Sequence, residues 1–83
     1  MEKSIHSQHY REFLDLLRAS RIECGLTQEE LATRLRTSQS FVSKCERGER
    51  RLDVVELRSW CNAIGVPMHD FIRHFDRAIA PDS

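Results

Sequence analysis

Apolar residues recur every three or four positions in five stretches of the chain, and each stretch is bounded by residues that start or stop helices. The first stretch runs from a Ser7 cap to about Cys24, with apolar positions at Tyr10, Phe13, Leu14 and Leu17. The last begins near Pro67, which suits a first helical turn, and carries Phe71, Ile72, Phe75, Ala78 and Ile79. We therefore predict one all-α domain over residues 1–83, with a flexible tail at 1–6 and a C-terminal helix at 67–80.

Two short amphipathic segments occupy residues 27–46, which read TQEELATRLRTSQSFVSKCE, and one tight turn at residues 35–37 separates them. Thr27 and Glu30 have the spacing of a capping box, in which each side chain accepts a hydrogen bond from the other residue's amide. Ser38 can cap the second segment. This arrangement predicts a helix-turn-helix formed by the second and third helices.

A fourth amphipathic segment follows the helix-turn-helix, after a charged loop at residues 49–51. Asp53 and Glu56 form a second capping box, and Gly65 ends the segment. Its predicted core positions are Leu57, Trp60, Cys61 and Ile64. The three cysteines, Cys24, Cys45 and Cys61, have no paired spacing, so we expect small core residues and no disulfide framework.

The outward face of the predicted third helix carries side chains that suit a DNA major groove. Glutamine can pair with adenine, lysine can donate to guanine, serine reaches bases or phosphates, and an aromatic ring can press on a thymine methyl group. The residues on this face are Gln39, Ser40, Ser43, Lys44 and Arg47, with Phe41 at its edge. Gln28 sits at a helix amino terminus, where free amides attract phosphate oxygens. We therefore predict double-stranded DNA as the partner.

Charge is distributed unevenly along a chain whose formal net charge is zero. Residues 34–51 hold six basic and two acidic side chains, a balance of +4, and the remainder holds seven basic and eleven acidic ones, a balance of −4. The positive charge lies where DNA would lie, so we expect binding that weakens with salt.

These residues resemble those of the lambda-repressor-like, or Xre, family of bacterial and phage regulators, over roughly residues 17–72. The matching positions are Arg21, Gly25-Leu26-Thr27-Gln28, Glu30-Leu31-Ala32, Ser38-Gln39, Glu46-Arg47-Gly48 and Gly65-Val66. The resemblance implies a compact five-helix fold. It also implies an internal ion pair between Arg21 and Glu46, which would join the first helix to the third.

The same resemblance implies roles at the DNA. Gln28 would bind a phosphate and brace the third helix, and Ser43 would lie near the DNA backbone. The implied base-facing residues are Gln39, Ser40 and Lys44, and the loop with Arg50 and Arg51 resembles a second phosphate-gripping loop. Two positions depart from the family pattern. Arg36 stands where Gly or Asn is usual. Either the turn differs slightly from that of the family, or a cost on the order of 1 kcal/mol is tolerated because Arg36 touches a phosphate. Cys45 replaces a larger apolar residue.

We expect a small transcriptional regulator, in first place a repressor that binds a palindromic operator as a homodimer. The candidate dimer residues are Phe71, Phe75 and Ile79. The alternative is an antitoxin or other protein-interaction module that binds DNA only for autoregulation, which requires those three residues to be exposed in the isolated chain. Control of a restriction-modification or mobile-element operon stays open as a variant of the first reading.

Other classes of protein fit the sequence poorly. The histidine pairs His6 with His9 and His69 with His74 lack a third ligand at metal spacing, so we expect no metal and no cofactor. Enzyme activity is not expected, because the chain offers no ordered nucleophile and base. There is no apolar run for a membrane span and no signal peptide, and we expect a cytoplasmic protein.

Overall fold

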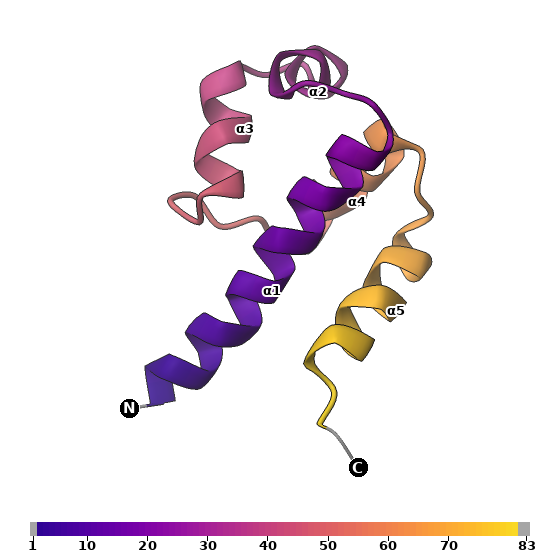
Figure 1. Cartoon of the computed structure of the whole chain (residues 1–83). Helices are drawn as coiled ribbons and strands as arrows, with labels where there is room; N and C mark the ends of the chain where they lie inside the picture. Colours follow the sequence, from indigo (N-terminus) through magenta and orange to yellow (C-terminus); the bar gives the residue numbers. More distant parts are fainter. Residues whose placement is uncertain (1, 82–83) are drawn as a thin grey trace.

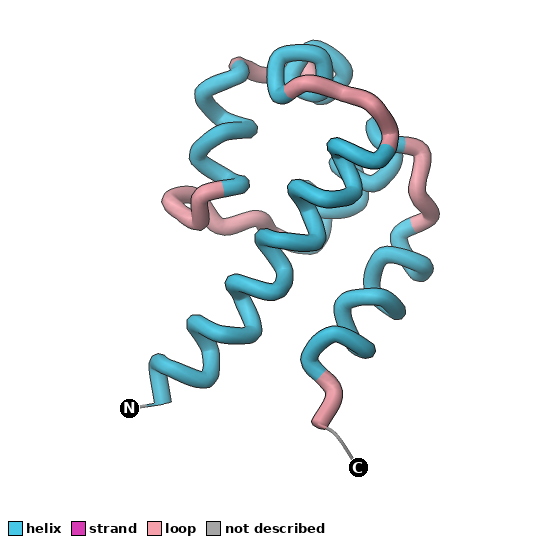
Figure 2. Tube along the Cα trace, in the orientation of Figure 1, coloured by secondary structure: helices cyan, strands magenta, loops and turns pink. Residues whose placement is uncertain are grey.

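The computed structural model describes residues 2–81, with side chains described for residues 8–81. The described chain forms five helices and no strand, which confirms the predicted all-α fold (Figure 2). The helices are α1 (Glu2–Glu23), α2 (Gln28–Leu35), α3 (Gln39–Glu46), α4 (Val54–Ile64) and α5 (Met68–Ile79).

The long α1 packs against α3 on one side and against α5 on the other (Figure 1). The short helices α2 and α3 lie together at one end of the molecule, α4 packs against α2 and α5, and α5 runs beside α1. As a result, the first turns of α1 and the last turn of α5 lie at the end of the molecule away from α2 (Figure 1).

Local capping fixes the starts of α2, α3 and α4, as the sequence predicts. Thr27 Oγ1 accepts from the Glu30 amide at 3.0 Å, and Glu30 Oε1 accepts from the Thr27 amide at 2.9 Å. Asp53 and Glu56 repeat this reciprocal pair at 2.7 and 2.9 Å. Ser38 Oγ accepts from the Phe41 amide at 3.1 Å. Each cap satisfies amides that the helix itself leaves without partners.

The start of α1 differs from the sequence prediction. The helix begins at Glu2, not at Ser7, so residues 2–6 continue it. No Gly or Pro interrupts residues 2–22, and a serine inside a helix costs little, so nothing in this stretch forces a later start. The predicted flexibility of residues 1–6 stays a prediction, and Met1 lies outside the described residues, as do the side chains of His6 and Ser7.

A single core joins all five helices. Phe13 of α1 packs edge-on against Phe71 and Phe75 of α5, with ring centroids 5.9 and 5.7 Å apart, a favourable geometry for aromatic pairs. The largest fully buried side chains are Trp60, Phe71, Leu17, Leu31, Val42, Cys45 and Cys61. Aromatic and aliphatic packing therefore fixes α5 to α1.

The cysteines divide into two kinds. Cys45 and Cys61 are buried, as predicted, and burial raises the pKa of the Cys45 thiol to about 11 and also raises the pKa of Cys61. The prediction that Cys24 is a core residue is wrong. Cys24 is exposed, because α1 ends at Glu23 and Cys24 lies in the turn that follows.

None of the helices in the described part of the chain combines the length and the apolar character needed to cross a membrane.

Candidate nucleic-acid interface

A buried ion pair attaches α3 to α1. Arg21 Nε donates to Glu46 Oε2 at 2.7 Å, and Arg21 Nη2 donates to Glu46 Oε1 at 3.0 Å. The Arg21 and Glu46 side chains are 9% and 3% exposed. Arg21 Nη1 also donates to the Leu26 carbonyl at 2.9 Å, at the entrance to α2. The two residues whose pairing the resemblance implies are therefore in contact, and they link α1, α2 and α3.

A second polar chain runs from Glu46 to the surface. Gln28 Nε2 donates to Glu46 Oε1 at 3.0 Å, and Gln39 Nε2 donates to Gln28 Oε1 at 2.6 Å. This chain ties the first residue of α2 to both ends of α3. It fixes the orientation of Gln39, whose Oε1 and second amide hydrogen stay available to a base or a phosphate.

The turn between α2 and α3 has a left-handed residue at Arg36, with φ 59° and ψ 44°. Its amide donates to the Thr33 carbonyl at 3.1 Å, which closes the end of α2. Arg36 thus adopts the conformation that a Gly or Asn would adopt more easily. Its side chain is exposed and makes no hydrogen bond to the rest of the described chain.

The outward face of α3, which we call the recognition face, carries the predicted DNA-contacting side chains. Gln39, Ser40 and Lys44 are exposed, whereas Ser43 and Phe41 are half-buried. A shallow cavity of about 430 Å³ lies between this face and the following loop, and it is lined by Ser38, Ser40, Phe41, Lys44, Glu49 and Arg50. The recognition face is therefore polar, open and indented.

Arg47, at the end of α3, is paired to the loop. Its guanidinium donates to Glu49 at 3.0 and 3.2 Å and also to Ser43 Oγ. The hydrogen bond between the two side chains lowers the pKa of Glu49 and raises that of Arg47. Both side chains are more than half exposed, so the pair is weak and a phosphate can compete for Arg47.

Arg50 bridges α3 and α4. Its two terminal nitrogens donate to the two carboxylate oxygens of Glu56 at 3.0 and 2.6 Å, and its guanidinium lies 5.2 Å from the centre of the Phe41 ring. The hydrogen bonds from Arg50 first, and then the one from the Asp53 amide, lower the pKa of Glu56. Arg50 therefore has a structural partner on each side, and Phe41 is partly covered by it.

Arg51 points the other way, toward α1. Its guanidinium lies 4.3 Å from the centre of the Tyr10 ring, a cation–π contact. Unlike Arg47 and Arg50, Arg51 has no carboxylate partner within the described residues. The two arginines of the predicted phosphate-gripping loop thus have different surroundings.

Sequence reasoning missed the partners of these arginines. Tyr10, Glu49 and Glu56 each hold one of them, and Arg34, counted in the positive segment, instead donates to the Ala63 carbonyl at the end of α4 at 2.8 Å. The sequence predicts Glu56 as a capping residue of α4, but not as the partner of Arg50. The contacts of Arg51 with Tyr10 and of Arg34 with Ala63 join residues far apart in the sequence, whereas Arg47 and Glu49 are only two positions apart.

The last helix presents less apolar surface than the sequence suggests. Phe71 is 1% exposed, so it is corrected from a dimer candidate to a core residue. Phe75 packs against Phe13, and both Phe75 and Ile79 are half-buried. The antitoxin alternative requires all three side chains to be exposed in one chain, and the burial of Phe71 counts against it.

Within residues 8–81 no three His, Cys, Asp or Glu side chains are grouped as metal ligands.

Comparison with known proteins places this geometry among helix-turn-helix proteins. A family model described as a helix-turn-helix domain matches residues 12–73. The structure is similar to an XRE-family like protein from Pseudomonas syringae pv. tomato, with 45% identity, a TM-score of 0.87 and 96% of each chain covered. It is also similar to the clp gene regulator ClgR from C. glutamicum, with 33% identity, a TM-score of 0.75, and 87% of this chain and 95% of that one covered.

Two further similarities carry less weight, one because its identity is low and the other because it covers a short stretch. A mutant restriction-modification controller protein has a TM-score of 0.81 but 23% identity, over 88% of this chain and 97% of that one, and so shows the fold alone. The uncharacterized HTH-type transcriptional regulator y4dJ of Sinorhizobium fredii is 46% identical over 46 residues, which cover 55% of this chain and 60% of that protein. The match thus spans less than two thirds of that relative.

Proposed function

The chain belongs to the XRE-like family of helix-turn-helix transcriptional regulators, and from this premise we propose that it represses transcription by binding a palindromic DNA operator as a homodimer. A protein of this function acts on the chromosome, so the proposal places it in the cytoplasm. The observation that supports the proposal most is the recognition face of α3, which is exposed and polar. The buried ion pair between Arg21 and Glu46 attaches this helix to α1 on its inner side.

Rigid attachment of α3 matters because base contacts depend on accurate geometry. A bidentate contact to a base edge distinguishes one base pair from another only if the side chain approaches at a fixed angle. The chain from Glu46 through Gln28 orients Gln39 before DNA arrives. We therefore assign Gln39 to base readout, together with Ser40 and Lys44.

Phosphate contacts would position the protein without reading sequence. The free amides at the amino ends of α2 and α3 are suited to phosphate oxygens, next to Gln28 and Ser38. Further contacts are assigned to Ser43 and to the four arginines Arg36, Arg47, Arg50 and Arg51, and Phe41 is assigned to a thymine methyl group at the edge of the recognition face. Arg47 and Arg50 must exchange a carboxylate for a phosphate, which adds a cost to each of these contacts.

A homodimer would place two recognition helices in major grooves about 34 Å apart, and a bound pair would occlude a promoter. Two half-sites also raise specificity above what one short helix supplies. We propose that Phe75 and Ile79 contribute to the dimer seam, since both are only half-buried in one chain.

Selection of bound duplexes from a random pool at moderate salt, followed by sizing of the complex on the best site, tests the proposal. An enriched palindrome with half-sites about one helical turn apart, bound by two chains, is the expected result. An enriched single half-site bound by one chain would overturn the dimer. No enrichment at all would overturn sequence-specific binding.

A further inference from the structure

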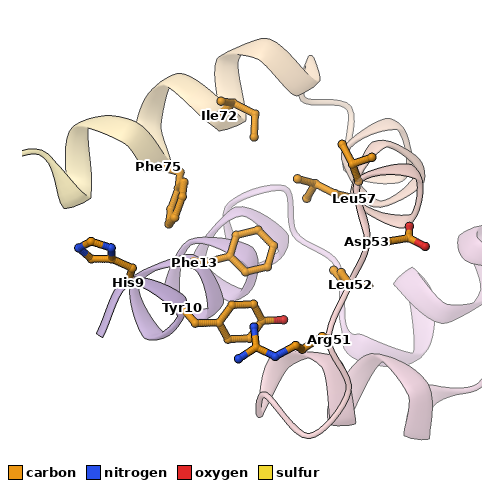
Figure 3. Close-up of a pocket in the computed structure, with 10 residues that line it drawn as sticks. His9, Tyr10, Phe13, Arg51, Leu52, Asp53, Leu57, Ile72 and Phe75 are labelled. Carbon is orange, nitrogen blue, oxygen red and sulfur yellow. The ribbon is translucent and has the colours of Figure 1, made fainter. Parts of the chain in front are cut away.

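A cavity of about 380 Å³ opens between α1, α5 and the segment that leads into α4 (Figure 3). Its walls are mainly apolar, with Phe13 from α1, Ile72 and Phe75 from α5, and Leu52 and Leu57 from the other side. Of the described residues that line it, none belongs to α3. The cavity is therefore separate from the recognition face.

The size and chemistry of this cavity suit a small organic ligand. Binding pockets in proteins start at about 300 Å³ and are largely apolar, with a few polar groups that orient the ligand. Ile72, on the α5 wall, is 41% exposed in one chain. A ligand body in the cavity would remove part of this apolar surface from water.

Arg51 covers Tyr10 at one side of the cavity, whereas His9, the other basic residue in the lining, lies at the Phe75 end (Figure 3). Arg51 has no carboxylate partner in the part of the chain that the structure describes. The Tyr10 hydroxyl is buried and also lacks a hydrogen-bond partner there. Asp53, the acidic residue in the lining, uses its carboxylate to accept from the Glu56 amide at 2.7 Å. One side of the cavity thus offers an exposed guanidinium that has no carboxylate partner among the described residues.

We propose that this cavity binds a small monocarboxylate with an apolar body, whose carboxylate pairs with the guanidinium of Arg51. A planar guanidinium matches a carboxylate with two parallel hydrogen bonds. The apolar body lies against Phe13 and Ile72. An apolar cation is a poorer fit, because Arg51 would repel it.

Arg51 gives the ligand a route to regulation, and this step rests on the proposed function. The same guanidinium is assigned to a DNA phosphate, and a carboxylate bound to it removes that contact. Ligand binding and DNA binding then weaken each other by the same factor. The monocarboxylate would act as an inducer.

Octanoate and its uncharged counterpart 1-octanol are the probes, titrated into the full chain without DNA and followed by calorimetry and by backbone amide NMR. We expect octanoate to bind and to shift signals of residues around Phe13, Ile72 and Phe75. Arg51→Gln should weaken octanoate binding about tenfold and leave octanol binding unchanged. No binding of octanoate, or equal loss of both probes in Arg51→Gln, would overturn the proposal.

Two glutamate substitutions separate the cavity from general surface effects. Ile72 and Val55 are both exposed β-branched residues, at 41% and 70%, but only Ile72 lines the cavity. Ile72→Glu should abolish binding of both probes, and Val55→Glu should change neither. Loss of binding in both variants, or in neither, would contradict the site. Sedimentation of the chain at each octanoate concentration measures whether octanoate changes the oligomeric state. If octanoate only dissociates a dimer, a second copy of the chain fills this groove, and the proposal is overturned.

The DNA step is tested separately on the selected duplex. Octanoate should lower the affinity of the unaltered chain for DNA and leave that of Ile72→Glu unchanged. Octanoate binding without any change in DNA affinity would overturn the competition at Arg51. A chain that selects no DNA sequence would overturn the proposed function, while the titrations without DNA would still decide the ligand site.

Discussion

Arg36 combines an unfavourable backbone conformation with a useful charge. A non-glycine residue in the left-handed region costs about 1 kcal/mol relative to glycine, and Arg36 has φ 59°. Its exposed side chain has no hydrogen bond in the described structure that would offset this cost, so the folded state gains nothing visible from an arginine here. A role at DNA explains its presence better than a role in folding.

Substitution of Arg36 tests that explanation. Arg36→Gly should raise the free energy of unfolding by about 1 kcal/mol and lower DNA affinity, because a cation at the turn is lost. Urea denaturation and a fluorescence binding assay measure the two effects. Arg36→Ala is the matched control, since it removes the charge but keeps the left-handed cost. Unchanged DNA affinity in both variants would show that Arg36 is not at the DNA.

Lys44 and Arg51 are assigned to different kinds of DNA contact, and their substitutions should differ accordingly. Lys44→Ala should cost about 1 to 3 kcal/mol on the matching site and relax the base preference at one position. Arg51→Ala should weaken binding to all sequences alike and flatten the salt dependence. Binding to a panel of single-base variants at two salt concentrations measures both. A uniform loss in both variants would refute the assignment of Lys44 to a base.

At the scale of the helices, the sequence predicts what is encoded locally. The caps at Thr27, Ser38 and Asp53 depend on residues three positions apart, so all three could be read directly. The beginning of α1 could not, because serine is both a cap and an acceptable helix residue. Cys24 was misplaced for a similar reason, since an apolar residue next to a helix end can lie on either side of it.

The side-chain partners of the arginines in the loop after α3 could not be predicted from the sequence. Nothing local indicates that Arg50 pairs with Glu56 or that Arg51 lies on Tyr10. These pairings depend on how the loop after α3 passes between α1 and α4, which the packing of the whole core determines. The residues of the candidate site could therefore be predicted, but not which of its arginines are paired with a carboxylate.

The attachment of α3 to α1 gives a stability prediction at this scale. Glu46→Ala leaves Arg21 buried without its charge partner, so the free energy of unfolding should fall by about 3 to 5 kcal/mol. Glu49→Ala removes the partner of an exposed arginine and should have little effect. Thermal and urea denaturation of both variants provide the comparison. A Glu46→Ala chain as stable as Glu49→Ala would mean that the buried pair contributes little to the fold.

The loop after α3 requires a glycine for two reasons. Gly48 has φ +82°, and a Cβ there would lie 2.9 Å from Leu14 Cδ1, whereas Gly25 has φ +81° with open space around it. Both Gly→Ala substitutions should cost about 1 kcal/mol from backbone strain, and Gly48→Ala should cost more, because Leu14 must move. Denaturation of each variant in the unaltered and Leu14→Ala backgrounds measures this. The difference between the two glycines should disappear in the Leu14→Ala background, and its persistence would place the extra cost elsewhere.

At the scale of the whole molecule, the proposed DNA-binding end and the proposed dimer seam are far apart. The α2 and α3 helices lie at one end, and the last turn of α5 lies at the other (Figure 1). A substitution in the seam should therefore leave the recognition face of each chain intact. This separation allows dimerization to be tested without altering the base contacts.

Ile79→Gln should weaken the dimer and leave single half-site binding unchanged. Burial of one isoleucine contributes about 1.5 to 3 kcal/mol, and a two-fold seam contains it twice, so the dimer dissociation constant should rise at least tenfold. Arg77→Gln is the control, because residue 77 lies on the opposite side of α5 and should not touch the seam. Sedimentation equilibrium gives the dissociation constant, and titration of one-half-site and two-half-site duplexes gives the coupling. If Ile79→Gln loses the additional DNA affinity that a second half-site provides, and Arg77→Gln keeps it, a seam on α5 is supported. Two variants that both stay dimeric would place the seam on another surface, and the apolar residues at the start of α4 would be the next to substitute.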